Sequence, residues 1–105
     1  MITTIVKYRS ARQLSREEVG KMMEYGARER FLGLPHLHSK QFCFNVETGE
    51  GLSVYLWDSR ESADAFFSED FLKEFEKIMG SRPTVEHHET IVLVDNRKGD
   101  VFVGD

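Results

Sequence analysis

The sequence predicts an α+β domain in which one antiparallel sheet of four strands carries two helices on one face. Two observations lead to this class. Segments rich in β-branched and aromatic residues, whose side chains alternate at a spacing of two, occur in four places, and two amphipathic segments with apolar residues three or four positions apart lie between them. The order is strand, helix, strand, strand, helix, strand, so each helix connects two strands of one sheet.

Size and charge limit what the chain can be. A chain of 105 residues is large enough for one domain. Its net charge of -4 comes from 14 basic residues interleaved with 18 acidic ones, which argues against a nucleic-acid partner or an anionic membrane surface. No apolar run is long enough for a membrane span or a signal peptide, so we expect a cytoplasmic protein. The single cysteine, Cys43, is expected to be a buried thiol.

The first strand and the first helix carry clear local signals. Residues 2–9 alternate as a strand. Ser15 and Glu18, three residues apart, form a capping box that begins a helix. Gly33 then ends this helix in the usual position, and Pro35 prevents its continuation.

The next two strands form a predicted hairpin. A strand over residues 36–45 places His38 and Lys40 on one face. The segment 47–51 contains two glycines and supplies the hairpin loop. The third strand, 52–57, carries large side chains on both faces, so we expect it to be covered on both sides.

The second helix is expected to begin after a cap at Asp58 or Ser59 and to end at Gly80 and Pro83. The segment 68–70 could end one helix and cap another, so a break is possible there. Apolar residues three or four positions apart form an aromatic stripe against the sheet. This stripe contains Phe66, Phe67, Phe71 and Phe75.

The fourth strand is predicted over residues 84–94, and its apolar end is expected to be buried on both sides. The complete order is the ferredoxin-like βαββαβ arrangement, whose sheet leaves one face bare. Because residues 52–57 and 91–94 are apolar on both faces, that bare face would be a large exposed patch, so we predict a homodimer that packs sheet to sheet. The domain is assigned to residues 1–95 and a C-terminal tail to 96–105.

Three segments resemble one known family. They are Pro35–Lys40 (PHLHSK), Gly51–Ser59 (GLSVYLWDS) and Ser62–Phe66 (SADAF). Together they are similar to the dimeric α+β barrel superfamily, and within it to the YdhR-like and antibiotic biosynthesis monooxygenases. The resemblance covers about residues 2–95, and the family tends to have Gly where this chain has His36.

The resemblance implies a dimer with a pocket in each subunit between the helices and the sheet. The superfamily includes cofactor-free monooxygenases that form quinones, heme-degrading oxygenases and polyketide cyclases, and the fold does not choose among them. The heme-degrading branch pairs a helical Trp with a later, heme-ligating His. The corresponding positions here hold Phe66 and Glu76, which disfavours heme degradation.

Histidines are the candidate catalytic bases, because imidazole is the side chain that titrates near neutral pH without perturbation. His38 and His87 are the two candidates. His87 and His88 leave opposite faces of the fourth strand, so at most one of them enters a pocket on the helix side, and we favour His87. His36 and His38 have the spacing of an HxH metal pair, but no carboxylate or thiol accompanies them, so no metal is predicted and His36 is interpreted as a solvated turn residue.

Candidate substrate-binding residues are the aromatic and charged side chains that would face the helices. Tyr55 and Trp57 share a strand face and would form either an aromatic wall for a planar ligand or part of the core. Lys40 is either a site residue or an edge-strand lysine that opposes aggregation. Phe66 and Phe71 belong to the aromatic stripe and could also line the pocket.

The leading hypothesis is a monooxygenase-like enzyme that uses no cofactor and acts on an aromatic or polycyclic small molecule. His38 or His87 would remove a proton from an electron-rich substrate, whose anion then meets oxygen. One alternative is a cyclase or isomerase that uses the same His with Tyr55 as the acid. Another is a dimeric protein that binds a small hydrophobic ligand without catalysis.

Overall fold

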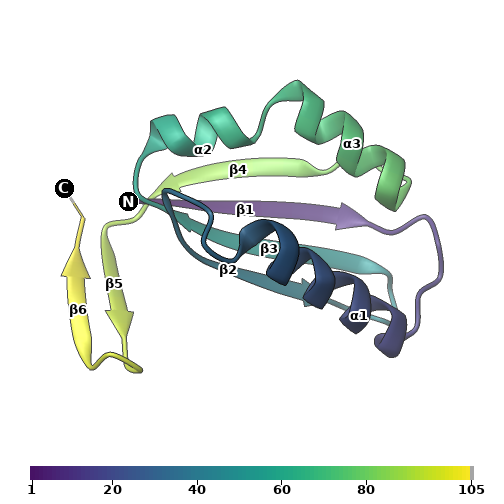
Figure 1. The fold of residues 1–105 in the computed structure, drawn as a ribbon, viewed down its shortest axis with the longest axis horizontal. Coiled ribbons are helices and arrows are strands. Elements are labelled where there is room, and N and C mark those ends of the chain that lie inside the picture. Colours follow the sequence, from purple (N-terminus) through teal and green to yellow (C-terminus); the bar gives the residue numbers. More distant parts are fainter. Residues whose placement is uncertain (105) are drawn as a thin grey trace.

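The computed structural model describes residues 1–104 as an α+β fold built on a four-stranded antiparallel sheet (Figure 1). The predicted class and the antiparallel sheet are confirmed, and the arrangement is compatible with a ferredoxin-like fold. The sheet order is β2-β3-β1-β4, so β2 and β4 are the edges. The strands are β1 (Ile2–Arg9), β2 (Leu37–Phe44), β3 (Glu50–Trp57) and β4 (Thr84–Glu89).

The helices cover one face of this sheet. They are α1 (Arg16–Gly26) with the π-helical turn η1 (Ala27–Phe31), then α2 (Arg60–Phe66) and α3 (Glu69–Met79). Ala63 of α2 packs with Val6 and Tyr55, and a second cluster joins Val19 and Met79 to the side chain of Tyr8. Val6 and Tyr8 leave the same side of β1, so both clusters lie on one face, which we call the covered face. No helix within residues 1–104 is long and apolar enough to cross a membrane.

Serine caps account for where the helices begin. The capping box predicted at Ser15 is present, with Ser15 Oγ 3.1 Å from the Glu18 amide nitrogen and Glu18 Oε1 2.9 Å from the Ser15 amide nitrogen. The break in the second helix also occurs, because Ser68 Oγ accepts the amide of Phe71 at 3.2 Å and starts α3 as a separate helix. Gly80, with φ of 80°, ends α3.

A β-bulge changes the predicted pattern of β2. Leu37 pairs with Trp57, and Lys40 pairs with Tyr55, but the register shifts between Leu37 and Ser39. His38 is the additional residue, so it does not follow the alternation that places Lys40 on the covered face. The prediction that His38 and Lys40 lie on one regular strand face is therefore wrong, and Leu37 takes the expected place of His38.

The predicted fourth strand ends earlier than expected. β4 stops at Glu89, and the chain leaves the sheet to form a separate hairpin of β5 (Val92–Asp95) and β6 (Asp100–Val103) (Figure 1). Ile91 is 64% exposed and Val94 is 61% exposed, so the expected burial of residues 91–94 is wrong for the single chain. The short VFV segment of the tail is ordered as β6.

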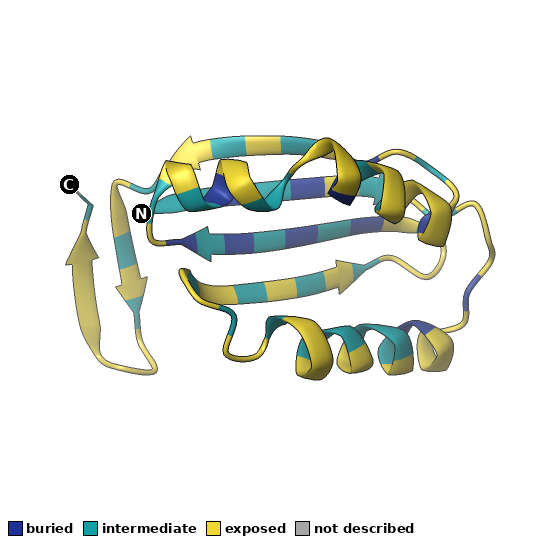
Figure 2. Ribbon diagram, turned by 45° about the horizontal axis from the view of Figure 1, so that its top comes forward, coloured by how far each residue is buried: buried dark blue, intermediate teal, exposed yellow. Residues whose placement is uncertain are grey.

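The other face of the sheet has no helix, and we call it the bare face. Its centre is an apolar strip of four partly exposed side chains. Figure 2 shows buried and partly exposed residues alternating along β3, because successive side chains point to the covered face and to the bare face. The strip consists of Ile5, Leu52, Val54 and Leu56. Cys43 pairs with Leu52 on this face and is exposed, so its predicted burial is wrong for the single chain.

Candidate functional site

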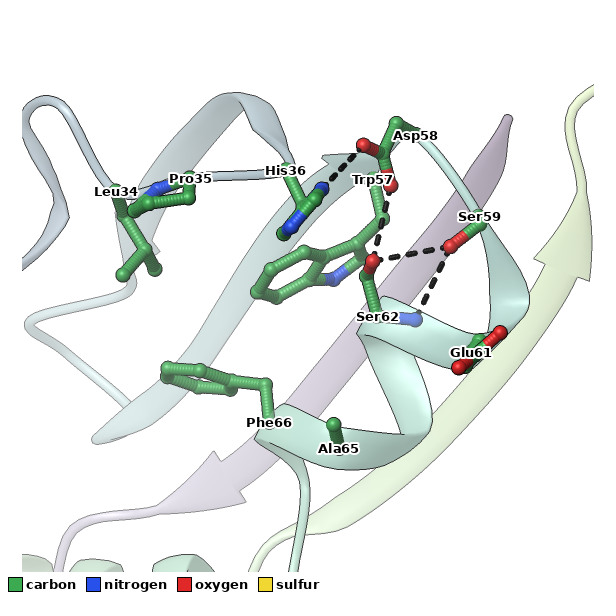
Figure 3. A pocket seen from close by; sticks show the side chains of 10 residues that line it. All are labelled: Leu34, Pro35, His36, Trp57, Asp58, Ser59, Glu61, Ser62, Ala65 and Phe66. Atoms are coloured by element: carbon green, nitrogen blue, oxygen red, sulfur yellow. Dashed lines mark hydrogen bonds and ion pairs between the residues drawn. The ribbon is translucent and has the colours of Figure 1, made fainter.

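A hollow lies where β3 ends and α2 begins (Figure 3). Its volume is about 780 Å³, and we call it the end pocket. The chain approaching β2 supplies one wall, and the first turns of α2 supply the other. The end pocket is lined by Leu34, Pro35, His36, Trp57, Asp58, Ser59, Glu61, Ser62, Ala65 and Phe66.

A histidine–aspartate pair lies at the rim of the end pocket. His36 Nδ1 is 2.7 Å from Asp58 Oδ2, and the Asp58 amide donates to the His36 carbonyl at 2.9 Å. Ser62 Oγ donates to the other carboxylate oxygen, Asp58 Oδ1, at 3.0 Å. The hydrogen bond from His36 is the main reason that the pKa of Asp58 lies below its ordinary value, and the bond from Ser62 adds to it. The carboxylate therefore stays ionised and oriented.

The backbone of His36 is held in an uncommon conformation. Its φ is 72°, in the left-handed region, and no other non-glycine residue among 1–104 has a positive φ. This conformation costs an L-residue about 1–2 kcal/mol, although Asn, Asp and His tolerate it better than most residues. Such strain in a non-glycine residue occurs more often at functional sites than elsewhere.

Asp58 favours one tautomer of the neutral imidazole. In the tautomer that donates Nδ1–H to the carboxylate, the lone pair is on Nε2, which can accept a proton from a ligand. Figure 3 shows one ring nitrogen of His36 turned toward Asp58 and the other turned away from it. The side chain is 62% exposed, so a ligand in the end pocket can reach Nε2. The pair has the geometry of a general base.

The inner wall of the end pocket is aromatic. Trp57 is 2% exposed, and its ring centroid lies 5.2 Å from that of Phe66. Trp57 Nε1 is buried and has no hydrogen-bond partner among the described residues. A buried donor without a partner costs about 1–3 kcal/mol, so an acceptor atom brought close to it would recover part of that cost.

A second, smaller cavity lies between the covered face and the helices. Its volume is about 140 Å³, close to the size that holds one benzene ring inside a protein, and we call it the inner cavity. Tyr55, Phe71, Lys40 and Arg30 are among its lining residues. Burial is the main cause that lowers the pKa of Lys40 to about 7, and burial also raises the pKa of Tyr55. Lys40 also lines an outer hollow of about 250 Å³ that includes His38.

His87 lies on the covered face, as favoured from the alternation of β4, while His88 is exposed on the other face. His87 Nδ1 is 2.8 Å from Thr4 Oγ1, and Nε2 is 3.7 Å from Asp64 Oδ1. Its side chain is 13% exposed, and burial is the main cause that lowers its pKa. His87 packs beside Phe67 and lines none of the three hollows described above. Its surroundings are those of a core histidine.

The residues predicted for the site therefore fall into separate places. Trp57 and Phe66 line the end pocket, whereas Tyr55, Lys40 and Phe71 line the inner cavity. His38 lies at the outer hollow, and His87 lies apart from all three. The structure does not bring His38 or His87 together with Trp57 and Phe66.

Sequence reasoning missed His36, Asp58 and Ser62 as a group. Asp58 was considered only as a helix cap, but the N-cap is Ser59, whose Oγ accepts the amide of Ser62 at 3.1 Å. The available signal was His36 itself, a titratable residue in the turn that precedes β2. Its left-handed backbone, which only the structure shows, makes the position a candidate functional site.

Residues 1–104 contain no group of three or more His, Cys, Asp or Glu side chains arranged to hold a metal ion. In comparisons with known proteins, no family model matches this chain, and no curated protein matches it.

Proposed function

We propose that the protein is a monooxygenase-like enzyme that uses no cofactor, acts on an aromatic small molecule, and binds it in the end pocket. The observation that carries this proposal is the 2.7 Å contact between His36 and Asp58 at the rim of an aromatic-walled hollow. The pocket of about 780 Å³ has room for a compound of two or three rings, which matches the usual size of ligand sites. The proposed base is His36, in place of His38 or His87.

The substrate class follows from the groups that line the pocket. A flat ring can pack on Trp57 and Phe66, beside the apolar side chains of Leu34 and Pro35. A phenolic hydroxyl is a donor, and His36 Nε2 can accept its hydrogen bond. A phenol or an enolised ketone on a fused ring system has such a hydroxyl.

The reaction needs only proton removal and oxygen. His36 takes the hydroxyl proton, and the carboxylate of Asp58 stabilises the imidazolium that forms. The electron-rich anion then donates electrons to O₂, and a new carbon–oxygen bond replaces a ring carbon–hydrogen bond. One phenol and one O₂ give one quinone and one water, so the substrate itself supplies the reducing electrons.

We also propose that the working unit is a homodimer of the dimeric α+β barrel type. The apolar strip of Ile5, Leu52, Val54 and Leu56 supports this, because a strip of this kind across a bare sheet favours association. Two chains packed through this face would cover the strip and Cys43 together. The end pocket opens beside α2, on the other side of the sheet, and would stay accessible.

Oxygen uptake tests the proposed activity. The purified chain is mixed with 1-naphthol or an anthrone while dissolved oxygen and quinone absorbance are recorded. His36→Asn keeps a residue that tolerates positive φ and can donate to Asp58, but it removes the base. We expect uptake at least about 100-fold slower for this variant, the usual contribution of a general base. His88→Asn, on the exposed opposite face, is the matched control and should match wild type.

Two results would contradict the proposal. If His36→Asn consumes oxygen at the wild-type rate while His87→Asn does not, the base is misassigned. If the same probes raise the Tm but oxygen never falls, the protein is not an oxygenase.

The same histidine–aspartate pair also suits a cyclase or isomerase, because both begin with proton removal from an acidic carbon or hydroxyl. Such an enzyme converts its substrate with no loss of oxygen. Tyr55, the acid expected for this alternative, lines the inner cavity and not the end pocket, so the geometry favours the oxygenase. A protein that binds without catalysis would return each probe unchanged.

A further inference from the structure

Lys40 has unusual surroundings for a lysine on an edge strand. Its Nζ lies 3.6 Å from the ring centroid of Phe31, 3.8 Å from that of Phe42 and 4.5 Å from that of Tyr55. An edge lysine that only opposes aggregation points into water. This amine lies instead among three rings on the covered face, so edge protection does not explain its position.

The amine has a positive neighbour and no carboxylate. None of the ion pairs or side-chain hydrogen bonds among residues 1–104 involves Lys40. Arg30, from η1, lines the same cavity and holds its guanidinium 5.4 Å from the centroid of Phe66. Burial, and then the repulsion from Arg30, lower the pKa of Lys40 to about 7. This shift enlarges the neutral fraction of the amine at neutral pH relative to an ordinary lysine.

A small molecule has space on both sides of this amine. Lys40 lines the inner cavity of about 140 Å³ and also the outer hollow of about 250 Å³. Both hollows open to the surface, so a ligand has access to the Lys40 side chain from either, and the mostly apolar lining of the inner cavity suits one ring or a short chain. A neutral amine beside an apolar chamber, with a second cation near it, is the arrangement that activates lysine as a nucleophile.

We propose that Lys40 is a nucleophilic amine that forms an imine with a small aromatic or short-chain aldehyde or ketone held in the inner cavity. This site is separate from the end pocket and does not depend on the function proposed there. The lone pair of Nζ attacks the carbonyl carbon, and the carbonyl oxygen takes up a proton to give a carbinolamine. Loss of one water then gives the imine, with no change in oxidation state.

Tyr55 is suited to assist this step. Its ring lies beside Nζ, and its side chain is 2% exposed. Burial raises the pKa of Tyr55, so its hydroxyl keeps its proton and can donate it as a hydrogen bond to the carbonyl oxygen. The inner cavity therefore offers a nucleophile and a hydrogen-bond donor to the same carbonyl group.

Reductive trapping tests the proposal on the wild-type chain. The protein is incubated at pH 7 with benzaldehyde and cyanoborohydride, which reduces an imine to a stable benzylamine, and the modified peptides are quantified by mass spectrometry. Lys21 is the internal reference, because it is an exposed lysine paired with Glu17. At pH 7 the neutral fraction of an amine with a pKa near 7 exceeds that of an ordinary lysine by about 1,000-fold. We expect Lys40 to carry most of the lysine label and the ratio of Lys40 to Lys21 to fall steeply at pH 10.

The opposite results are equally clear. Equal labelling of Lys40 and Lys21 at pH 7, or labelling of Lys21 alone, would overturn the proposal. A chain with Lys40→Met should lose the Lys40 label and keep that on Lys21, which confirms the site assignment. Because the decisive comparison uses the wild-type protein, it holds even if this variant folds poorly. Oxygen uptake at the end pocket is measured separately, so failure of one proposal leaves the other intact.

Discussion

The covered face and the bare face of the sheet come from the same strands but carry different kinds of residue. On the covered face, β2 and β3 present Lys40, Tyr55 and Trp57 toward the helices, and both candidate cavities lie on that side. On the bare face, the same strands present Val54 and Cys43 without any cover. Under the proposed function, the period of two along each strand would place the reaction on one face and the dimer contact on the other. Changes to one face should affect the reaction, and changes to the other should affect the oligomer.

The largest expected effect comes from the covered side, at Asp58. In Asp58→Asn the amide can no longer stabilise an imidazolium, and it can hold His36 in the wrong tautomer. We expect turnover of 1-naphthol or an anthrone to fall by about 100–10,000-fold, with the mass of the particle in solution unchanged. Oxygen uptake measured beside light scattering checks both parts. If Asp58→Asn instead dissociates the dimer while each chain keeps full activity, the proposed division of roles between the two faces is wrong.

Lys40 gives a second test of the covered face, through the dependence of stability on pH. The folded chain has a pKa of about 7 at this amine, whereas an unfolded lysine has about 10.4. Below pH 7 both states are charged, and folding bears the full cost of burying the charge. As pH rises above 7, the folded amine loses its proton first, so this cost disappears. The free energy of unfolding should therefore rise by about 3 kcal/mol between pH 7 and 9.5.

Urea denaturation at several pH values measures this rise. In Lys40→Met the stem remains apolar but nothing titrates, so the curve over this range should be nearly flat. Lys21→Met, on exposed α1, is the control and should keep the wild-type slope. Parallel curves for wild type and Lys40→Met would mean that the amine is solvated.

On the bare face, Val54→Lys places a charge at the centre of the apolar strip. In a dimer packed through this face, two copies of that charge would be brought close together in a dry interface. We expect dimerisation to weaken by on the order of 2 kcal/mol, roughly thirtyfold in Kd, with turnover per chain little changed. Gln13→Lys adds the same charge at an exposed position and should leave the dimer intact. Analytical sedimentation measures the dimer Kd of both variants and of wild type. If wild type itself is a monomer, the proposed dimer is wrong.

The smallest expected effect concerns α3, one of the helices that cover the sheet. Ser68→Ala removes the oxygen that accepts the amide of Phe71 at the start of α3. We expect a loss of about 1 kcal/mol in the free energy of unfolding, seen as a lower urea midpoint. Phe71 lines the inner cavity, so imine trapping at Lys40 should also become less selective. An unchanged midpoint would show that packing alone starts this helix.

Features that depend on neighbouring residues could be predicted from the sequence. Each helix boundary depends on residues within four positions of it. Examples are the capping box at Ser15, the N-cap at Ser68 and the C-cap at Gly80. The class of the fold follows from these local signals and from the alternation of apolar residues. The exit of the chain from the sheet after Glu89 could not be predicted, because residues 91–94 are β-branched and apolar whether they extend β4 or form a hairpin.

The candidate site was harder to predict, because it depends on contacts between distant residues. His36 and Asp58 are 22 positions apart, and only the pairing of β2 with β3 brings them together. The bulge at His38 shifts the register by one residue, which changes which histidine is available to a pocket. Lys40 was recognised as unusual, but its three aromatic neighbours come from two strands and from η1, which no period in the sequence indicates.

The left-handed backbone of His36 has a consequence for evolution. Few residues tolerate a φ of 72°, and among Gly, Asn, Asp and His only histidine is a base that titrates near neutral pH. Substitutions that preserve the turn therefore abolish the proton acceptor, whereas most others disturb the turn itself. Under the proposed function, selection at this single codon would act on catalysis with little change in folding. In any related chain that keeps the turn, the residue at this position would then distinguish active enzymes from inactive copies of the same scaffold.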